Sequence, residues 1–207
     1  EVLHRWVEWS DPSHMLIHTF NDNAFEHLDR RAREIAPLNT MEAWQARQRK
    51  VRAALDSLVG PFPDKTPLNS EVTGVVRKDG YRIEKVLFES MPDFHVTACL
   101  YVPDGLDGPA PAILNLIGHT DIAFRGEGYQ RVILNLVRQG FIVFAVDPIG
   151  QGERKQYWDP AQGRSAVGGA TAEHSYVGRQ CFISGVSVAK YFIWDGIRAV
   201  DYLLTRE

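Results

Sequence analysis

The sequence predicts an α/β fold in which a helical segment precedes antiparallel strands, and these lead into a parallel, helix-covered sheet. Two observations support the parallel part of this prediction. Residues 110–117 and 141–146 are apolar except for Asn115, as strands buried on both faces of a parallel sheet usually are. A helical pattern separates them, and a strand, helix, strand order implies a right-handed crossover between neighbouring parallel strands.

Residues 1–66 are predicted to form the helical segment, which packs on the core, and residues 67–207 the main domain. One helix is well marked because Asn39 or Thr40 can cap it and Glu42 follows in its first turn. Gly60 and Pro61 end it. Its apolar face consists of Trp44, Val51, Leu55 and Leu58. Further aromatic residues of the segment are Trp6, Trp9, Phe20 and Phe25.

His14 and His18 stand four residues apart, a spacing that can hold a metal ion on one helix face. No carboxylate or third histidine completes a recognisable motif around them. We therefore expect two surface or half-buried histidines and no metal.

Strand patterns begin after residue 70. Residues 72–76, 82–88 and 95–102 are rich in β-branched and aromatic side chains, and Asp79-Gly80 is a strong two-residue turn. These features predict an antiparallel meander. The crossover helix beginning near Gly128 is predicted from apolar residues at helical spacing, namely Tyr129, Val132, Ile133, Leu136 and Val137. Gly140 ends it.

Both apolar strands run into polar loops that contain glycine. The first loop is Gly118-His119-Thr120-Asp121, and the second spans residues 147–154. Open α/β sheets bind ligands at the carboxyl ends of their strands, so we expect the functional site where these two loops meet.

Residues 185–189 nearly match GxSxG, the strand-to-helix turn that exposes a serine nucleophile. That motif requires a strand directly before the serine. Apolar residues instead recur every three or four positions from Phe182 to Leu204, which predicts one helix running through Ser187. Ser187 is therefore not expected to be a nucleophile.

Composition excludes several classes of function. The formal net charge of -3 gives no basic surface for nucleic acid, and no apolar run approaches the roughly 20 residues that span a bilayer. Cys99 and Cys181 are expected to pack as small buried hydrophobes. The first residue is not methionine. This suits a processed protein, expected to be secreted or periplasmic rather than cytoplasmic, and it equally suits a trimmed sequence.

The end of the first apolar strand, the loop of residues 147–154, a later turn and the final helix carry a family resemblance. The strand ending Asn115-Leu116-Ile117-Gly118-His119, the Asp147-Pro148-Ile149-Gly150-Gln151-Gly152-Glu153-Arg154 loop, the Thr171-Ala172-Glu173-His174 turn and helix 191–204 together resemble the N-terminal part of an acetyl-xylan-esterase-like α/β-hydrolase. The resemblance covers about residues 70–207. It implies a serine esterase whose nucleophile strand, acid and histidine all follow in chain order, beyond Glu207.

By this resemblance the chain contributes the oxyanion hole, through the backbone of Gly118, His119 or Thr120. The imidazole of His119 has two open roles, lining the acyl pocket or only capping the strand end. Asp147 is expected to hydrogen-bond amides of its own loop. The remaining candidate pocket residues are Gln151, Glu153 and His174. Glu153 can instead pair with Arg154. Glu173 and His174 can instead stand at the start of a helix capped by Thr171.

These observations predict a carboxylic ester hydrolase, acting on acylated carbohydrate or a similar small ester, of which this chain holds only the oxyanion and pocket half. The remaining C-terminal half, in the same polypeptide or in a second chain, is its expected partner. The alternative is a non-catalytic binding module with an α/β-hydrolase-like fold. No cofactor is expected, because neither loop supplies the GxGxxG of dinucleotide-binding folds.

Overall fold

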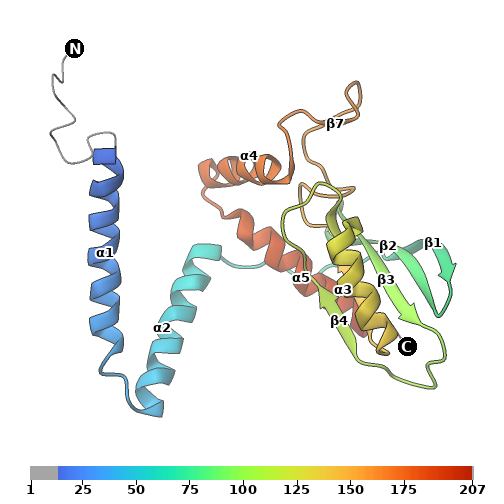
Figure 1. Ribbon diagram of the computed structural model, residues 1–207, viewed down its shortest axis with the longest axis horizontal. Helices are drawn as coiled ribbons and strands as arrows, with labels where there is room; N and C mark the ends of the chain where they lie inside the picture. The colour runs from blue at the N-terminus through green and yellow to red at the C-terminus, as the bar shows by residue number, and fades with distance from the viewer. Residues whose placement is uncertain (1–13, 207) are drawn as a thin grey trace. The chain divides into compact units, whose positions relative to one another are not determined.

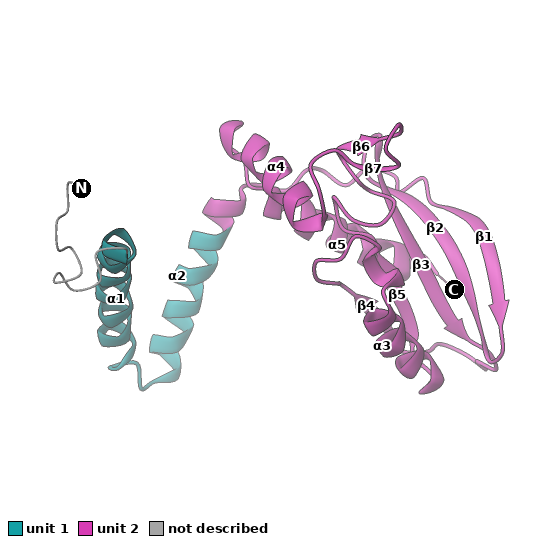
Figure 2. Cartoon of the chain, turned by 45° about the horizontal axis from the view of Figure 1, so that its top comes forward, with its two compact units in different colours: residues 1–55 teal, residues 56–207 magenta. Residues whose placement is uncertain are grey.

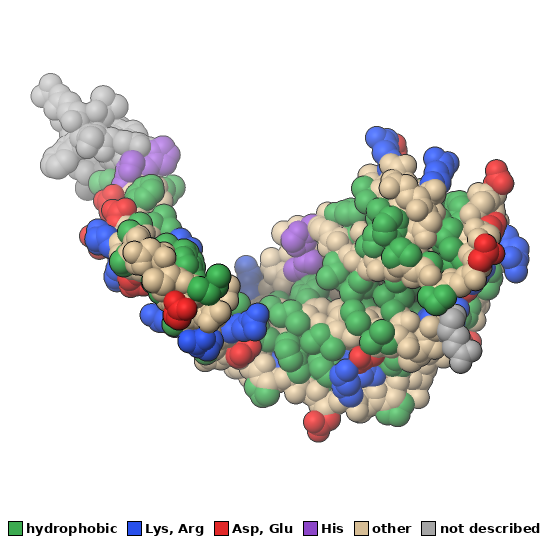
Figure 3. Space-filling view, turned by 90° about the horizontal axis from the view of Figure 1, so that it is seen from below, with side chains coloured by type: hydrophobic (Ala, Val, Ile, Leu, Met, Phe, Trp, Pro, Cys, Tyr) green, Lys and Arg blue, Asp and Glu red, His purple; other side chains and the backbone are tan. Residues whose placement is uncertain are grey.

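A computed structural model describes residues 14–206 and divides the chain into two compact units, residues 1–55 and 56–207 (Figures 1 and 2). The first unit holds α1 (Met15–Ile35) and most of α2 (Met41–Val59). Thr40 caps α2, since its Oγ1 accepts a hydrogen bond from the Ala43 N–H at 3.2 Å. Hydrophobic and charged side chains share the surface of these helices (Figure 3). Trp6 and Trp9 lie outside the described residues, and packing of the segment on the core stays a prediction.

The second unit is built on a five-stranded sheet in the order β1-β2-β3-β5-β4. Its strands are β1 (Glu71–Lys78), β2 (Tyr81–Met91), β3 (Phe94–Pro103), β4 (Ala112–Asn115) and β5 (Ile142–Val146). Strands β1 to β3 form the predicted antiparallel meander, and Gly80 takes the positive φ of 82° that its tight turn requires. β5 pairs antiparallel with β3 and parallel with β4.

The predicted crossover is confirmed, because α3 (Glu127–Arg138) joins the two parallel strands β4 and β5. The prediction that both strands are buried on both faces is wrong for β4. Within the described residues β4 is an edge strand with β5 as its one neighbour, and none of its residues is fully buried. Apolar character alone did not distinguish an edge strand from a central one.

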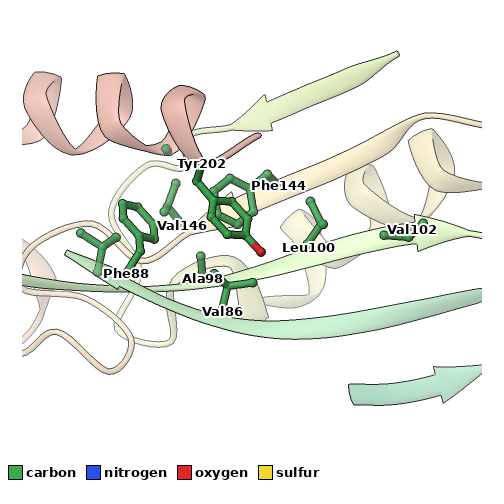
Figure 4. Close-up of a cluster of buried hydrophobic side chains, with 10 residues drawn as sticks. Val86, Phe88, Ala98, Leu100, Val102, Phe144, Val146 and Tyr202 are labelled. Carbon is green, nitrogen blue, oxygen red and sulfur yellow. The ribbon is translucent and has the colours of Figure 1, made fainter. Parts of the chain in front are cut away.

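Side chains of β5 alternate between two hydrophobic clusters, one on each face of the sheet. Val143 and Ala145 face α3 and pack with its Ile133 and Val137. Phe144 faces α5 (Val188–Leu204), where its ring lies 4.9 Å from that of Tyr202 (Figure 4). Burying one such aromatic side chain contributes about 1.5–3 kcal/mol to folding. The two clusters therefore fix the position of β5 and of the loop after it.

The predicted single helix through Ser187 is wrong. α4 (Ala170–Ile183) ends before Gly185, which takes a left-handed φ of 73°, and α5 begins after Ser187. Ser187 is the N-cap of α5, and its Oγ accepts a hydrogen bond from the Ala189 N–H at 3.2 Å. Because it follows a helix and a turn, Ser187 does not stand at a strand-to-helix turn.

Between β5 and α4 the chain forms a small two-stranded hairpin of β6 (Trp158–Asp159) and β7 (Arg164–Ser165). The prediction that Thr171 caps α4 is also wrong. The N-cap is Gly169, and a distant side chain does the capping, since Asp121 Oδ1 accepts the Ala170 N–H at 2.7 Å. None of the helices in the described part of the chain is long and apolar enough to cross a bilayer.

Candidate active site

A hollow of about 340 Å³ opens at the carboxyl ends of β4 and β5. Five of the residues proposed from the sequence line it, namely Gly118, His119, Asp147, Gln151 and His174. The two others lie apart from it. Thr120 lines an adjoining hollow, and the Glu153 side chain is 66% exposed and paired with Arg125 at 2.7 Å.

Asp147 is fully buried at the end of β5, where it organises the second loop. Its carboxylate accepts hydrogen bonds from Thr97 Oγ1 at 2.7 Å, from Arg125 Nη1 at 2.8 Å and from the Glu153 N–H at 3.3 Å. Burial lowers the pKa of Arg125, but the hydrogen bond and charge of Asp147 outweigh this and leave it raised. A carboxylate held in this way is a structural anchor of the site wall.

Two glycines of this loop allow backbone approaches that a larger residue would block. A Cβ on Gly152 would stand 2.3–2.6 Å from the Asp147 carboxylate, and one on Gly150 only 2.8 Å from Glu173 Cβ. Both glycines also have positive φ angles, 57° and 78°. The loop therefore closes tightly over Asp147 and against α4.

The loop after β4 has two of its three candidate N–H groups already bonded. The Gly118 N–H donates to Tyr129 Oη at 2.8 Å, and the Thr120 N–H donates to Gln151 Oε1 at 2.6 Å. The His119 N–H has no acceptor among the residues that the structure describes. Of the three, it is the group that remains available to a ligand.

Aromatic rings form one wall of the hollow. The ring centroids of His119 and His174 lie 4.7 Å apart, and the rings of His174 and Phe192 meet edge to face with their centroids 5.1 Å apart. His174 Nε2 lies 2.7 Å from the carbonyl oxygen of Ile149, so this nitrogen carries the proton and donates. Burial, together with the neighbouring His119, lowers the pKa of His174 below its ordinary value. His174 is thus neutral near pH 7.

An ion pair that the sequence did not predict lies beneath the hollow. Arg154 Nη1 donates to Asp195 Oδ2 at 2.8 Å and to the backbone oxygen of Asp147 at 3.0 Å. Glu153 and Arg154 do not pair with each other, because they bind Arg125 and Asp195 instead. These partners are 28 and 41 residues away in sequence, so no local pattern could have indicated them.

Glu173 is buried and serves the hairpin loop rather than the hollow. Its carboxylate accepts the N–H groups of Gln156 at 2.9 Å and Tyr157 at 3.3 Å. Burial also raises the pKa of the Cys99 thiol to about 11, which keeps this cysteine protonated and unreactive. Within the described residues, no group of three or more His, Cys, Asp and Glu side chains is placed to hold a metal ion.

The family model described as "Abhydrolase family" matches residues 7–167, more than half of the chain. The chain belongs to this family. The match includes the meander, both parallel strands and the two loops of the site, and it confirms the α/β-hydrolase resemblance. No curated protein matches the sequence.

Two solved structures support the same fold. A protein from Bacteroides fragilis NCTC 9343, described as a "putative acetyl xylan esterase", is 22% identical over 82% of this chain, with a TM-score of 0.66. The methylesterase BT1017 is 22% identical over 84% of this chain, with a TM-score of 0.54. The chain spans 45% and 36% of the lengths of these two proteins.

Proposed function

We propose that the chain supplies the oxyanion loop and pocket half of a serine carboxylic ester hydrolase, which removes acyl groups from carbohydrate or similar small esters. The observation that carries this proposal is the unbonded backbone N–H of His119, a residue that lines a partly apolar hollow; this N–H has no acceptor among the described residues. Both solved relatives named above bear the names of ester hydrolases, which agrees with the proposal.

The chemistry follows from where charge develops. Attack on an ester carbonyl places negative charge on its oxygen, and a backbone N–H already aimed at that position stabilises it. In α/β-hydrolases one such donor follows the nucleophile and another comes from the loop that bears His119 here. We assign this second donor to the His119 N–H. Tyr129 and Gln151 hold the loop by binding the N–H groups on either side.

The nucleophile, acid and base are proposed to lie on a C-terminal half outside residues 1–207, in the same polypeptide or in a second chain. The open edge of β4 supports this, because an unpaired strand can accept a further strand of the sheet. Apolar side chains on the exposed side of α5, Ile193, Val200 and Leu204, would also gain cover there.

The test compares hydrolysis of a simple acetyl ester by residues 1–207 and by a polypeptide extended through the rest of the domain. Residues 1–207 alone should turn over the ester roughly a thousandfold or more slowly, because transition-state binding without nucleophile and base leaves only residual catalysis. Labelling of residues 1–207 by a serine-directed phosphonate would contradict the proposal. An extended protein without activity would favour the binding module instead.

The donor assignment has its own test in the extended protein. His119→Pro removes the N–H and should lower kcat about a hundredfold or more, whereas His119→Ala keeps the N–H and should retain most activity. Equal activity of the two variants would show that the oxyanion is bound by another group.

A further inference from the structure

A second hollow, of about 470 Å³, lies against the β6–β7 hairpin. Two cationic side chains line it, those of Lys155 and Arg164, and Asp121 is the one acidic residue in its lining. Lys155 is half-buried and Arg164 is exposed. We call this hollow the hairpin pocket.

The two cations have no counterion among the described residues. Arg164 donates from Nε and Nη2 to the neutral Gln162 Oε1, at 3.0 and 2.9 Å. Asp159 faces Arg164 across the hairpin, but its carboxylate accepts hydrogen bonds from Ala161 and Gln162. Asp121 is likewise engaged, by the Ala170 N–H. Asp121 keeps its negative charge, so the hairpin pocket is lined by two positive side chains and one negative side chain, and neither cation forms an ion pair with a described residue.

Backbone donors add to this charge. Gly168 and Gly169 also line the pocket, and their N–H groups have no acceptor among the described residues. An anion in the pocket would therefore meet both charged side chains and neutral N–H groups, the usual combination in protein anion sites.

A third hollow has lining residues in common with both the hairpin pocket and the candidate active site. A shallow hollow of about 620 Å³ shares His119 with the active-site hollow and shares Asp121 and Gly169 with the hairpin pocket. A ligand held at both His119 and Lys155 would pass along this shallow hollow.

We propose that the hairpin pocket binds the carboxylate of a uronic acid unit in the same glycan that presents its ester at His119. This inference rests on the proposed function for the ester, while the anion site itself does not. A carboxylate is the common anionic group of carbohydrates, and the planar Arg164 guanidinium can bind both its oxygens. The substrate class is therefore an acidic, ester-bearing oligosaccharide.

Binding is measured by calorimetry on residues 1–207, so that no turnover is needed. The probes are a galacturonic acid trisaccharide, its carboxyl-reduced neutral counterpart and free galacturonic acid. The acidic trisaccharide should bind at least about tenfold more tightly than either of the others, because charge-assisted hydrogen bonds and contacts along the shallow hollow act together. Equal affinity for the acidic and neutral trisaccharides, or for the trisaccharide and the monosaccharide, would overturn the proposal.

Two variants locate the site. Lys155→Met and Arg164→Gln should each weaken binding of the acidic trisaccharide about tenfold and leave the neutral one unaffected. Lys78→Met removes the same charge from the exposed end of β1 and serves as the control. An equal loss in the control would show nonspecific attraction and contradict the assignment. Failure of ester hydrolysis in the extended protein would refute the proposed function without changing these binding results.

Discussion

The loops after the two parallel strands differ in how their polar groups are used. After β5, Asp147 is buried under hydrogen bonds from Thr97, Arg125 and the Glu153 N–H. After β4, His119 is exposed, and its N–H has no acceptor among the described residues. The loop after β5 is a structural support, and the loop after β4 presents groups to a ligand. Substitutions should therefore affect stability in one loop and mainly chemistry in the other.

The largest expected effect comes from Asp147→Ala. Thr97 and Arg125 would lose a buried partner, so the free energy of unfolding should fall by about 3 kcal/mol, with the exposed side of Arg125 limiting the loss. Urea unfolding measures it. The control is Glu127→Ala, which breaks an ion pair of the same 2.8 Å length on the surface of α3. It should lower the free energy of unfolding by only a small fraction of the loss expected for Asp147→Ala. Equal losses would contradict the supporting role of Asp147.

Next in size is Gly152→Ala. The new Cβ would collide with the Asp147 carboxylate, in addition to the strain of a positive φ. Gly163→Ala has a similar φ of 62° with no heavy atom within 4 Å, so it isolates the backbone strain. We expect the free energy of unfolding of the Gly152→Ala variant to be about 2 kcal/mol lower than that of the Gly163→Ala variant. A smaller difference would mean that the loop can move away from the new side chain.

The pH dependence of stability should report on His174. Its pKa is lowered in the folded protein, so the unfolded chain binds the proton more tightly. The stability that depends on neutral His174 is present above its ordinary pKa of 6.5 and is lost as the pH falls through the lower, folded pKa. In thermal unfolding between pH 7.5 and 5, His174→Gln should flatten this fall. An unchanged slope would place the effect on another histidine.

The smallest effect on stability is expected for His119→Ala. The side chain is exposed and forms no hydrogen bond with the described residues, so the free energy of unfolding should change by less than about 0.5 kcal/mol. A loss above 1 kcal/mol would show that the contact with the His174 ring stabilises the fold, and the contrast between the loops would weaken.

Sequence patterns predicted the elements that repeat locally. The meander follows from runs of β-branched and aromatic residues and from the Asp79-Gly80 turn, and α3 follows from apolar residues at helical spacing. The parallel pairing of β4 with β5 follows from two apolar runs with a helix between them. Strand order does not follow from such patterns, which is why β4 was expected to be buried on both faces. The break before α5 carried a readable signal, Gly185 followed by the capping Ser187, but the regular apolar spacing across it favoured one continuous helix.

In the site, sequence placed both loops at the correct end of the sheet because each follows an apolar strand. It could not show which N–H group is open, since that depends on Tyr129 and Gln151 reaching back to residues 118 and 120. The sequence did not predict the roles of Arg125 and Asp195 for the same reason. Their partners are 22 and 41 residues away, and only the folded chain brings them together.

The strand order has a consequence for the sequence of events in folding. β4 precedes β5 along the chain, yet β5 lies between β4 and β3. During synthesis the meander can form as soon as β3 is made, whereas β4 must wait until residue 146 has been added before it finds a neighbour. Pairing of β3 with β5 also closes a long loop, which is slow. We therefore expect the meander to form early and both loops of the site to acquire their shape together, in the step that inserts β5.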